Sequence, residues 1–243
     1  MSPRVPSPPK PPRLYFSFRS PYSRMAIVKL QRAVPDMFDR FDVIPYWDPD
    51  ERTAAALATA GGELPYVQMS RAKHFYILGD TKRLAEQMGL TMVWPIDKSP
   101  WWEPVHLGWL VARDLGRGPQ FYQAAITARW ERGEDLDDPA VLASVSREAG
   151  VEPDLISVAP DDPTVRSRGV ECLMNAYNDD VFGVPYIKFG RHRFWGLDRV
   201  DLFLQAWRDQ EPDRVHGEIA TSRVAEIPDE PAAYDADTAG GCG

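Results

Sequence analysis

Cysteine is scarce in this sequence, and its scarcity argues against two classes of protein. Only two cysteines occur in 243 residues, Cys172 and Cys242. They lie far apart and form neither a CxxC pair nor a metal-ligand pattern, which disfavours both a disulfide scaffold and a zinc site. We therefore assign no metal ligands. Cys172 falls on an apolar helical face and is expected to belong to the core.

Long apolar runs are also missing. No stretch approaches the ~18 consecutive apolar residues that cross a bilayer. The proline-rich start lacks the apolar core of a signal peptide. The sequence therefore predicts a cytoplasmic protein without a membrane partner.

A surplus of basic charge is missing as well. The formal net charge is −8, with 26% charged and 44% hydrophobic residues. This balance argues against a general nucleic-acid surface, and a chain of this length can bury a sizeable core. We expect the partner to be a small molecule or another protein.

The most informative stretch that is present is Ser20-Pro21-Tyr22-Ser23, directly after the apolar residues 14–18. Proline suits the first helical position, and a serine before it caps the free amides of the first turn. The local prediction is strand, serine cap, helix. The same amides and the helix dipole stabilise anions, so a thiolate held near Ser20 would have a lowered pKa. From these four residues alone, Ser20 is either only a cap or also an anion site.

Hydrophobic periodicity predicts the order of elements. Residues 13–18 and 41–46 indicate strands that flank a helix from Tyr22 to Ala33, which is a βαβ unit. The middle of the chain shows helical stretches at 53–60, 82–88, 104–115, 119–132 and 139–149. Asp138 is expected to cap the last of these, with Pro139 in its first turn.

The last part of the chain predicts a helix from Asp162-Pro163, then a hairpin of residues 184–189 and 193–196 with His192 in its turn. Asp198 is expected to cap a final helix. This order predicts an α/β thioredoxin-like fold (13–52 and 160–209) with an inserted all-helical subdomain (53–159). Residues 1–12 are expected to be a disordered proline-rich lead, and 210–243 an acidic tail that is disordered or an arm on a partner subunit.

Four segments carry a resemblance to a known family. They are the strand followed by Ser20-Pro21-Tyr22-Ser23, residues 130–139, Phe182-Gly183-Val184-Pro185, and residues 194–199. On these segments the chain resembles the 2-hydroxychromene-2-carboxylate isomerase and kappa-class glutathione transferase family over roughly residues 14–208. The resemblance implies a DsbA-like fold in which serine replaces the usual redox cysteine. The thiol then comes from bound glutathione or another low-molecular-weight thiol.

The resemblance also implies roles for particular residues. Ser20 is the catalytic residue that holds the thiolate, and Tyr22 of the same motif belongs to the thiol site. The backbone of Val184 pairs with the cysteinyl part of the thiol, ahead of a cis Pro185. Leu197 and Asp198 hold its γ-glutamyl end.

The sequence departs from the family pattern at one place. Where the family carries Asn-x-Pro-Pro, this chain has Gly62-Glu63-Leu64-Pro65, so the amide side chain is missing. For the substrate pocket we name Arg24, which suits a carboxylate, and Trp101 and Trp102, which suit a flat conjugated molecule. A solvated arginine and ordinary aromatic packing are the alternatives.

Together with the resemblance, these residues predict a thiol-dependent cis-trans isomerase of a conjugated aromatic or polyene substrate. Because members of that family often form dimers, the resemblance also implies a homodimer. Three alternatives stay open: a cofactor-independent isomerase in the same cleft, a kappa-class-type glutathione transferase, and a non-catalytic binding protein. A serine hydrolase is disfavoured, because the histidines (His74, His106, His192 and His216) are scattered and none lies in the Ser20 motif.

Overall fold

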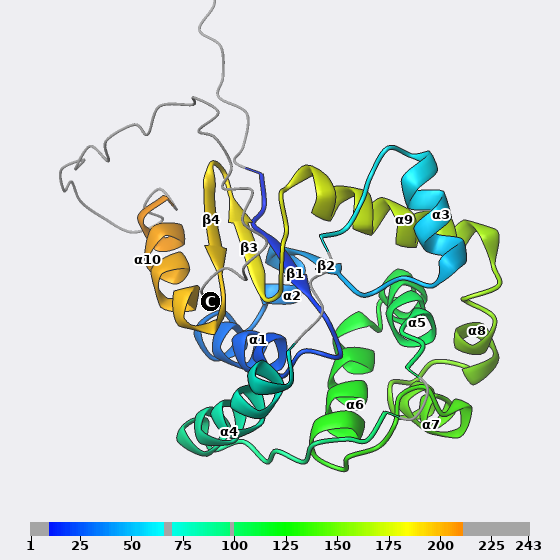
Figure 1. Ribbon diagram of the computed structural model, residues 1–243, viewed down its shortest axis with the longest axis horizontal. Helices are drawn as coiled ribbons and strands as arrows, with labels where there is room; N and C mark the ends of the chain where they lie inside the picture. The colour runs from blue at the N-terminus through cyan, green and yellow to red at the C-terminus, as the bar shows by residue number, and fades with distance from the viewer. Residues whose placement is uncertain (1–9, 66–69, 98–99, 211–243) are drawn as a thin grey trace, which may run out of the picture.

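The computed structural model describes residues 10–65, 70–97 and 100–210 (Figure 1). All but residues 10–12 of the expected proline-rich lead lie outside these ranges, as does the expected tail beyond residue 210.

A four-stranded mixed sheet lies at the centre of the described residues. Its order is β2-β1-β3-β4, with β1 at Arg13–Phe16, β2 at Asp42–Pro45, β3 at Tyr186–Phe189 and β4 at His192–Trp195. β1 pairs parallel with β2 and antiparallel with β3, and β3 and β4 form a hairpin. The carboxyl ends of β1 and β2 therefore share one edge, which is where ligands bind in sheets of this kind.

The side chains of β1 alternate between the two faces of the sheet. The Tyr15 hydroxyl donates to Asp179 at 2.6 Å and lies 3.1 Å from the carbonyl oxygen of Asn175, at the end of α9 (Pro163–Asn178). Leu14 and Phe16 consequently point to the opposite face. All three β1 side chains are fully buried, so β1 is the centre of the core.

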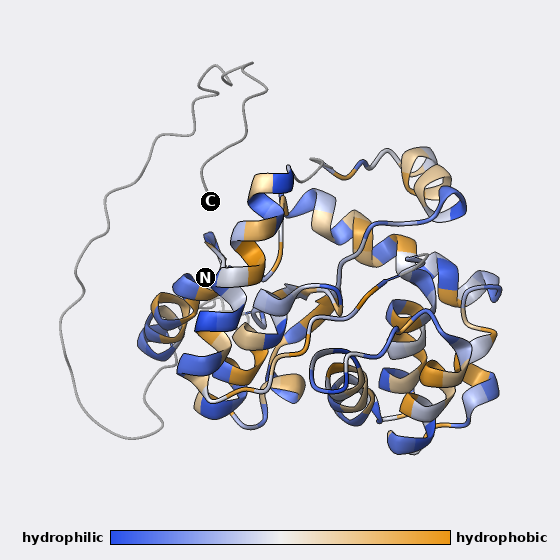
Figure 2. Ribbon diagram, turned by 60° about the horizontal axis from the view of Figure 1, so that its bottom comes forward, coloured by the Kyte–Doolittle hydropathy of each residue, from blue (hydrophilic) through white to orange (hydrophobic). Residues whose placement is uncertain are grey.

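Two helices, α1 (Pro21–Ala33) and α10 (Val200–Gln210), pack together beside the hairpin (Figure 1). Phe203 of α10 makes edge-on ring contacts with Phe41, Phe189 and Phe194. Figure 2 shows the hydrophobic colour gathering where these helices meet the strands. Burial of this apolar face stabilises the packing of the helices on the sheet.

The helices α3 to α8 occur in the sequence between β2 and α9. α3 (Glu51–Thr59) packs on α9 and α4 (Arg71–Met88) on α1, whereas α5 (Glu103–Asp114), α6 (Gly118–Trp130), α7 (Pro139–Glu148) and α8 (Pro153–Ser157) pack on one another (Figure 1). α5 also packs on α9, and this contact requires Gly169. A Cβ atom there would lie 2.6 Å from Leu107 and 3.2 Å from Trp47.

The structure confirms the predicted βαβ unit, the hairpin and the helix order. Two predicted side-chain contexts are also found: Asp138 caps α7 by accepting from Ala140, and Cys172 is buried. α9 begins at Pro163 as expected, and Asp162 caps it. The described residues between α3 and α8 hold helices and no strand. The exact domain boundaries stay a prediction.

Several element predictions were wrong. α4 begins at Arg71 rather than near residue 82, because Ser70 caps it and residues 71–76 are exposed, so no apolar periodicity marks its first turns. His192 opens β4 instead of lying in the turn. Asp198 does not cap α10. It lies inside a short 3-10 helix, η1 (Leu197–Arg199), and its carboxylate bonds to Arg199.

Two short helices were not predicted, α2 (Met37–Arg40) and α8. Each is too short to show a full apolar repeat.

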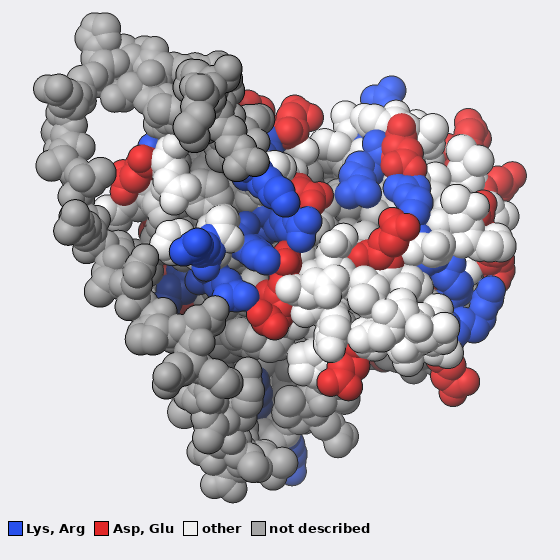
Figure 3. Space-filling model, turned by 90° about the horizontal axis from the view of Figure 1, so that it is seen from above, with Lys and Arg blue, Asp and Glu red and all other residues white. Residues whose placement is uncertain are grey.

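The surface mixes charges of both signs, and on the face in Figure 3 the Lys and Arg side chains lie beside Asp and Glu. Exposed ion pairs such as Arg52–Asp161 at 3.2 Å and Arg193–Asp180 at 2.7 Å link neighbouring elements. Within the described ranges, no helix is long and apolar enough to span a bilayer, and no group of three or more His, Cys, Asp or Glu is placed to hold a metal ion.

Candidate functional site

Ser20 stands where β1 gives way to α1. Its side-chain oxygen accepts a hydrogen bond from the Ser23 N–H at 3.1 Å, and Pro21 occupies the first helical position, so the predicted cap is confirmed. The Ser20 hydroxyl also points at the carbonyl oxygen of Val184, at 3.5 Å. Ser20 is partly buried and lies at the carboxyl edge of the sheet.

The Val184–Pro185 peptide bond is cis, as predicted. Val184 is partly buried and immediately precedes Pro185 and β3. The Pro185 carbonyl accepts from the Gly196 N–H at 2.9 Å, which ties this loop to the end of β4. Within the described residues the Val184 N–H has no hydrogen-bond acceptor. The structure thus brings Ser20 and the Val184 backbone together from opposite ends of the chain.

Asp179 anchors the loop that leads to Val184. It is 2% exposed and accepts from Lys188 at 2.5 Å, Tyr15 at 2.6 Å and Arg13 at 3.0 Å. Burial alone would raise the pKa of Asp179, but the hydrogen bonds from these groups hold it below its usual range. This carboxylate therefore fixes the end of α9 to β1 and β3, next to the site.

Leu197 and Asp198 lie in η1, which packs beside α1. Leu197 is partly buried, and the Asp198 side chain is 71% exposed and paired with Arg199. The predicted ligand roles of both residues stay predictions. The structure leaves the Asp198 carboxylate reachable from solvent.

Tyr22 is engaged by a neighbouring helix. Its hydroxyl donates to Asp80 of α4 at 2.8 Å. Burial, and then the Asp80 carboxylate, raise the pKa of Tyr22, so the phenol stays protonated. Its role in holding a thiol stays a prediction, and the observed hydrogen bond joins α1 to α4.

Arg24 is also engaged, and it faces inward. Its side chain is 2% exposed, and its guanidinium donates to Glu131 at 2.8 Å and to the Thr91 carbonyl at 2.6 Å. Burial lowers the pKa of Arg24, while Glu131 favours its charged form. This placement favours a structural role over the predicted carboxylate subsite.

The two adjacent tryptophans have different surroundings. Trp102 is 3% exposed and packs its ring on the guanidinium of Arg129, 4.8 Å from the ring centre, so it follows the packing alternative. Trp101 is 43% exposed, and its indole N–H donates to Asp50 at 3.2 Å. Only Trp101 presents its ring to solvent.

Sequence reasoning missed His106 of α5. Its Nε2 accepts from the Phe18 N–H at 3.2 Å and lies 3.3 Å from Ser17 Oγ, while Nδ1 donates to the Trp102 carbonyl at 2.7 Å. His106 is fully buried, and burial lowers its pKa to about 3. A usable signal was its position on the apolar side of α5, three residues before Trp109.

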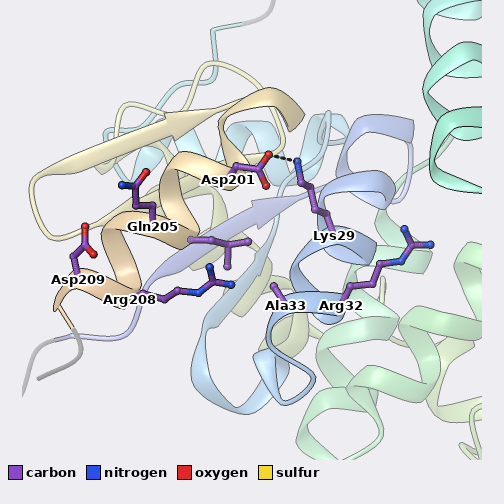
Figure 4. Close-up of a pocket in the computed structure, with 8 residues that line it drawn as sticks. Lys29, Arg32, Ala33, Asp201, Gln205, Arg208 and Asp209 are labelled. Atoms are coloured by element: carbon purple, nitrogen blue, oxygen red, sulfur yellow. Dashed lines mark hydrogen bonds and ion pairs between the residues drawn. The ribbon is translucent and has the colours of Figure 1, made fainter. Parts of the chain in front are cut away.

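Two surface hollows of the described chain lie away from Ser20 and Val184. One of about 540 Å³ is a groove between α1 and α10, where Lys29 donates to Asp201 at 2.7 Å (Figure 4). Another, of about 420 Å³, lies near the amino end of β2 and the start of α6. Neither is lined by Ser20 or Val184, so we base the candidate site on the hydrogen-bonding groups and not on cavity size.

The fold, together with the groups at the carboxyl end of β1, indicates the class to which this protein belongs. Residues 13–208 match the family model of the DSBA-like thioredoxin domain, and the chain belongs to that family. The expected thioredoxin-like fold with added helices is thereby confirmed.

Within this class, the chain is similar over most of its length to two isomerases of the same name. The chain is 28% identical over 195 residues to the 2-hydroxychromene-2-carboxylate isomerase of Sphingobium xenophagum, covering 79% of this chain and 95% of that protein. The corresponding isomerase of Pseudomonas putida is 24% identical over 194 residues, covering 79% and 91%. The likeness expected from the sequence motifs is therefore found.

Solved structures agree on the fold. A 2-hydroxychromene-2-carboxylate isomerase superposes with a TM-score of 0.63 at 22% identity, covering 82% of this chain and 95% of that one. A probable DsbA oxidoreductase from Streptomyces coelicolor gives a TM-score of 0.61 at 16% identity, covering 89% and 98%. At these identities the structures show the fold alone.

Proposed function

We propose that this protein is an isomerase that uses a bound low-molecular-weight thiol, with glutathione the first candidate, to interconvert the cis and trans forms of a conjugated substrate. One observation carries the proposal: a serine hydroxyl, not a thiol, caps α1 opposite the Val184 backbone and the cis Pro185. The names of the two sequence relatives support the reaction class.

The residues at this edge fit a thiol in three respects. The Ser20 hydroxyl reaches its Val184 acceptor only at 3.5 Å, so it can turn and donate to a stronger acceptor such as a thiolate. The amino end of α1 favours negative charge. The Val184 N–H, without an acceptor in the described residues, suits pairing with a peptide-like ligand.

A thiol held by Ser20 and Val184 would supply a nucleophile for reversible addition to an electron-poor double bond, the chemistry that permits cis-trans interconversion without net change to the thiol. Ser20 would keep the sulfur ionised by donating to it. Val184 would orient the cysteinyl backbone by donating its N–H and accepting through its carbonyl. At the far end, the exposed carboxylate of Asp198 would accept from the γ-glutamyl ammonium in place of Arg199.

The segment Gly62-Glu63-Leu64-Pro65 favours a second candidate. It lacks the amide side chain expected in the family pattern, so the same edge of the sheet could serve an isomerase without a thiol. The two candidates differ in one measurable property, which is whether the folded protein binds a free thiol.

Thermal unfolding of the full chain with glutathione, cysteine or coenzyme A tests the proposal. We expect glutathione to raise the melting temperature, since a ligand that binds only the folded state stabilises it by about 2.7 kcal/mol at one hundred times its Kd. S-methylglutathione, which cannot ionise at sulfur, should stabilise less. No stabilisation by any of these thiols would remove the thiol from the proposal and leave the second candidate.

A matched pair of variants isolates the role of Ser20. Ser20→Ala and Ser70→Ala each remove a serine N-cap, at α1 and at α4 respectively. Each should cost about 1 kcal/mol of stability. Only Ser20→Ala should weaken glutathione binding, and equal binding by both variants would contradict the role of Ser20.

We further propose that the protein is a cytoplasmic homodimer, the location following from the sequence and the dimer from the family resemblance. Sedimentation of the purified chain tests the dimer, and a monomer at micromolar concentration would contradict it.

A further inference from the structure

The loop that carries Ser20 is held by side chains from outside it. Phe18 lies two residues before Ser20 and beyond the last residue of β1. Its N–H donates to His106 Nε2 of α5 at 3.2 Å, and its carbonyl accepts from the Trp130 indole N–H of α6, also at 3.2 Å. The N–H and the carbonyl of Phe18 thus each have a hydrogen-bond partner in a side chain, one from α5 and one from α6.

His106 is built to be an acceptor at this position. Nδ1–H donates to the Trp102 carbonyl, which leaves the Nε2 lone pair for the Phe18 N–H. The ring stacks on Trp47, with ring centres 5.1 Å apart and planes at 15°, and meets the Phe18 ring edge-on at 5.2 Å. With no solvent access and these contacts, the imidazole is locked in place.

Trp130 is equally fixed. It is fully buried, with the Arg129 guanidinium 4.9 Å from its ring centre and the Trp94 ring edge-on at 5.5 Å. The next residue, Glu131, accepts from Arg24 in the second turn of α1. The end of α6 therefore holds both the loop before Ser20 and the helix after it.

A third contact joins the start of the loop to the first turn of α1. The Ser17 N–H donates to Ser23 Oγ at 3.3 Å, while Ser23 donates its own N–H to Ser20 Oγ. Ser23 is fully buried. With Phe18 held on both sides, the backbone from Ser17 to Ser20 has little freedom to move relative to α1.

We propose that His106 and Trp130 are positioning residues that, by holding the Phe18 peptide groups, set the Ser20 hydroxyl opposite Val184. They touch no ligand themselves. The claim that they tune ligand binding rests on the proposed function, whereas the claim that they order the loop does not.

The chain offers a matched control for Trp130. Trp109 of α5 is 1% exposed, and its indole N–H donates to the Gly118 carbonyl at 3.1 Å and not to the Ser20 loop. Its ring meets Phe16 of β1 edge-on, with ring centres 5.3 Å apart, so the two tryptophans both pack near the loop and differ in where the indole hydrogen bond goes. Trp130→Phe and Trp109→Phe each remove one buried indole hydrogen bond. For His106, Gln keeps an acceptor near the Nε2 position, and Leu removes it.

Hydrogen–deuterium exchange of the peptide covering residues 17–25, which excludes the Trp109 contact at Phe16, reads the loop without any ligand. We expect exchange in this peptide to be about tenfold faster in Trp130→Phe and His106→Leu than in Trp109→Phe, with His106→Gln intermediate. Equal exchange in Trp130→Phe and Trp109→Phe at equal loss of melting temperature would overturn the proposal. If His106→Leu does not fold, His106→Gln and the tryptophan pair still decide.

Glutathione titration of the same variants separates the two proposals. Where the wild-type protein binds glutathione, Trp130→Phe should weaken binding about tenfold and Trp109→Phe less than about twofold. Equal weakening would overturn the positioning role. Where the wild-type protein binds no thiol, the thiol-dependent function fails, and the exchange contrast alone decides whether His106 and Trp130 order the loop.

Discussion

Ser20 Oγ lies 3.5 Å from the carbonyl oxygen of Val184, although 164 residues separate them in the chain. The parallel pairing of β1 with β2 sets Ser20 at the carboxyl edge of the sheet, and the antiparallel pairing of β1 with β3 brings Val184 to the same edge. β1 leads into the amino end of α1, and β3 follows the cis Pro185. This juxtaposition is what makes the edge a candidate thiol site.

We expect Arg24 to stabilise the fold and not to bind substrate. Removing the buried Arg24 side chain breaks its ion pair with the partly exposed Glu131 and its bond to the Thr91 carbonyl, so we expect Arg24→Ala to cost about 2 kcal/mol of unfolding free energy, measured by urea denaturation. The control is Arg19→Ala, whose side chain is 49% exposed and pairs with Asp48, and which should cost less than about 1 kcal/mol. An Arg24→Ala protein of wild-type stability that has lost affinity only for carboxylate ligands would restore the predicted substrate role.

His106 should make stability depend on pH. Burial lowers its pKa from the usual 6.5 to about 3, so between these values the unfolded chain binds a proton that the folded chain does not. The free energy of unfolding therefore falls as the pH falls through this window, by about 1.4 kcal/mol per pH unit for this one group.

Urea denaturation of wild type and His106→Gln from pH 6 to pH 4.5 measures this slope. The carboxyl groups contribute equally to both proteins, so the difference between the two slopes isolates His106. We expect His106→Gln to show the smaller slope. Parallel pH profiles would mean that His106 is protonated in the folded protein and does not accept from Phe18.

Asp198 should recognise the γ-glutamyl end of glutathione. Asp198→Asn should weaken glutathione binding about tenfold, because the ammonium loses a charged acceptor. The matched control is Asp201→Asn, since both side chains are 71% exposed and each pairs with a cation, Arg199 or Lys29.

The same pair of variants should behave alike toward N-acetylcysteine, a thiol without that ammonium. Calorimetric titration of both ligands measures the contrast. A loss of affinity for glutathione that is equal in Asp198→Asn and Asp201→Asn would contradict the assignment.

Local signals made the core of the fold predictable. The Ser20-Pro21 start of α1, the Asp138 and Asp162 caps and the two strand patterns are decided by neighbours in sequence, so they could be recognised without the structure. The cis Pro185 followed only from the family resemblance.

The rest depended on tertiary contacts that no local pattern encodes. The inward turn of Arg24 is set by Glu131, and the burial of Trp102 by Arg129, each far away in the chain. The role of His106 depends on a single backbone N–H at Phe18. The exposed first turns of α4 carry no apolar stripe, which is why its start was misplaced.

The pKa of the glutathione thiol in the complex tests the central claim most directly, through the ultraviolet absorbance of the thiolate as pH is raised. Cys172 is no interference, because burial raises its pKa to about 12, and a Cys242→Ser background removes the other thiol. We predict that bound glutathione titrates at least one unit below the ordinary thiol value of about 8.5, and that Ser20→Ala abolishes most of this shift. A bound thiol that titrates at its free value, or a lowered pKa that survives in Ser20→Ala, would contradict the account.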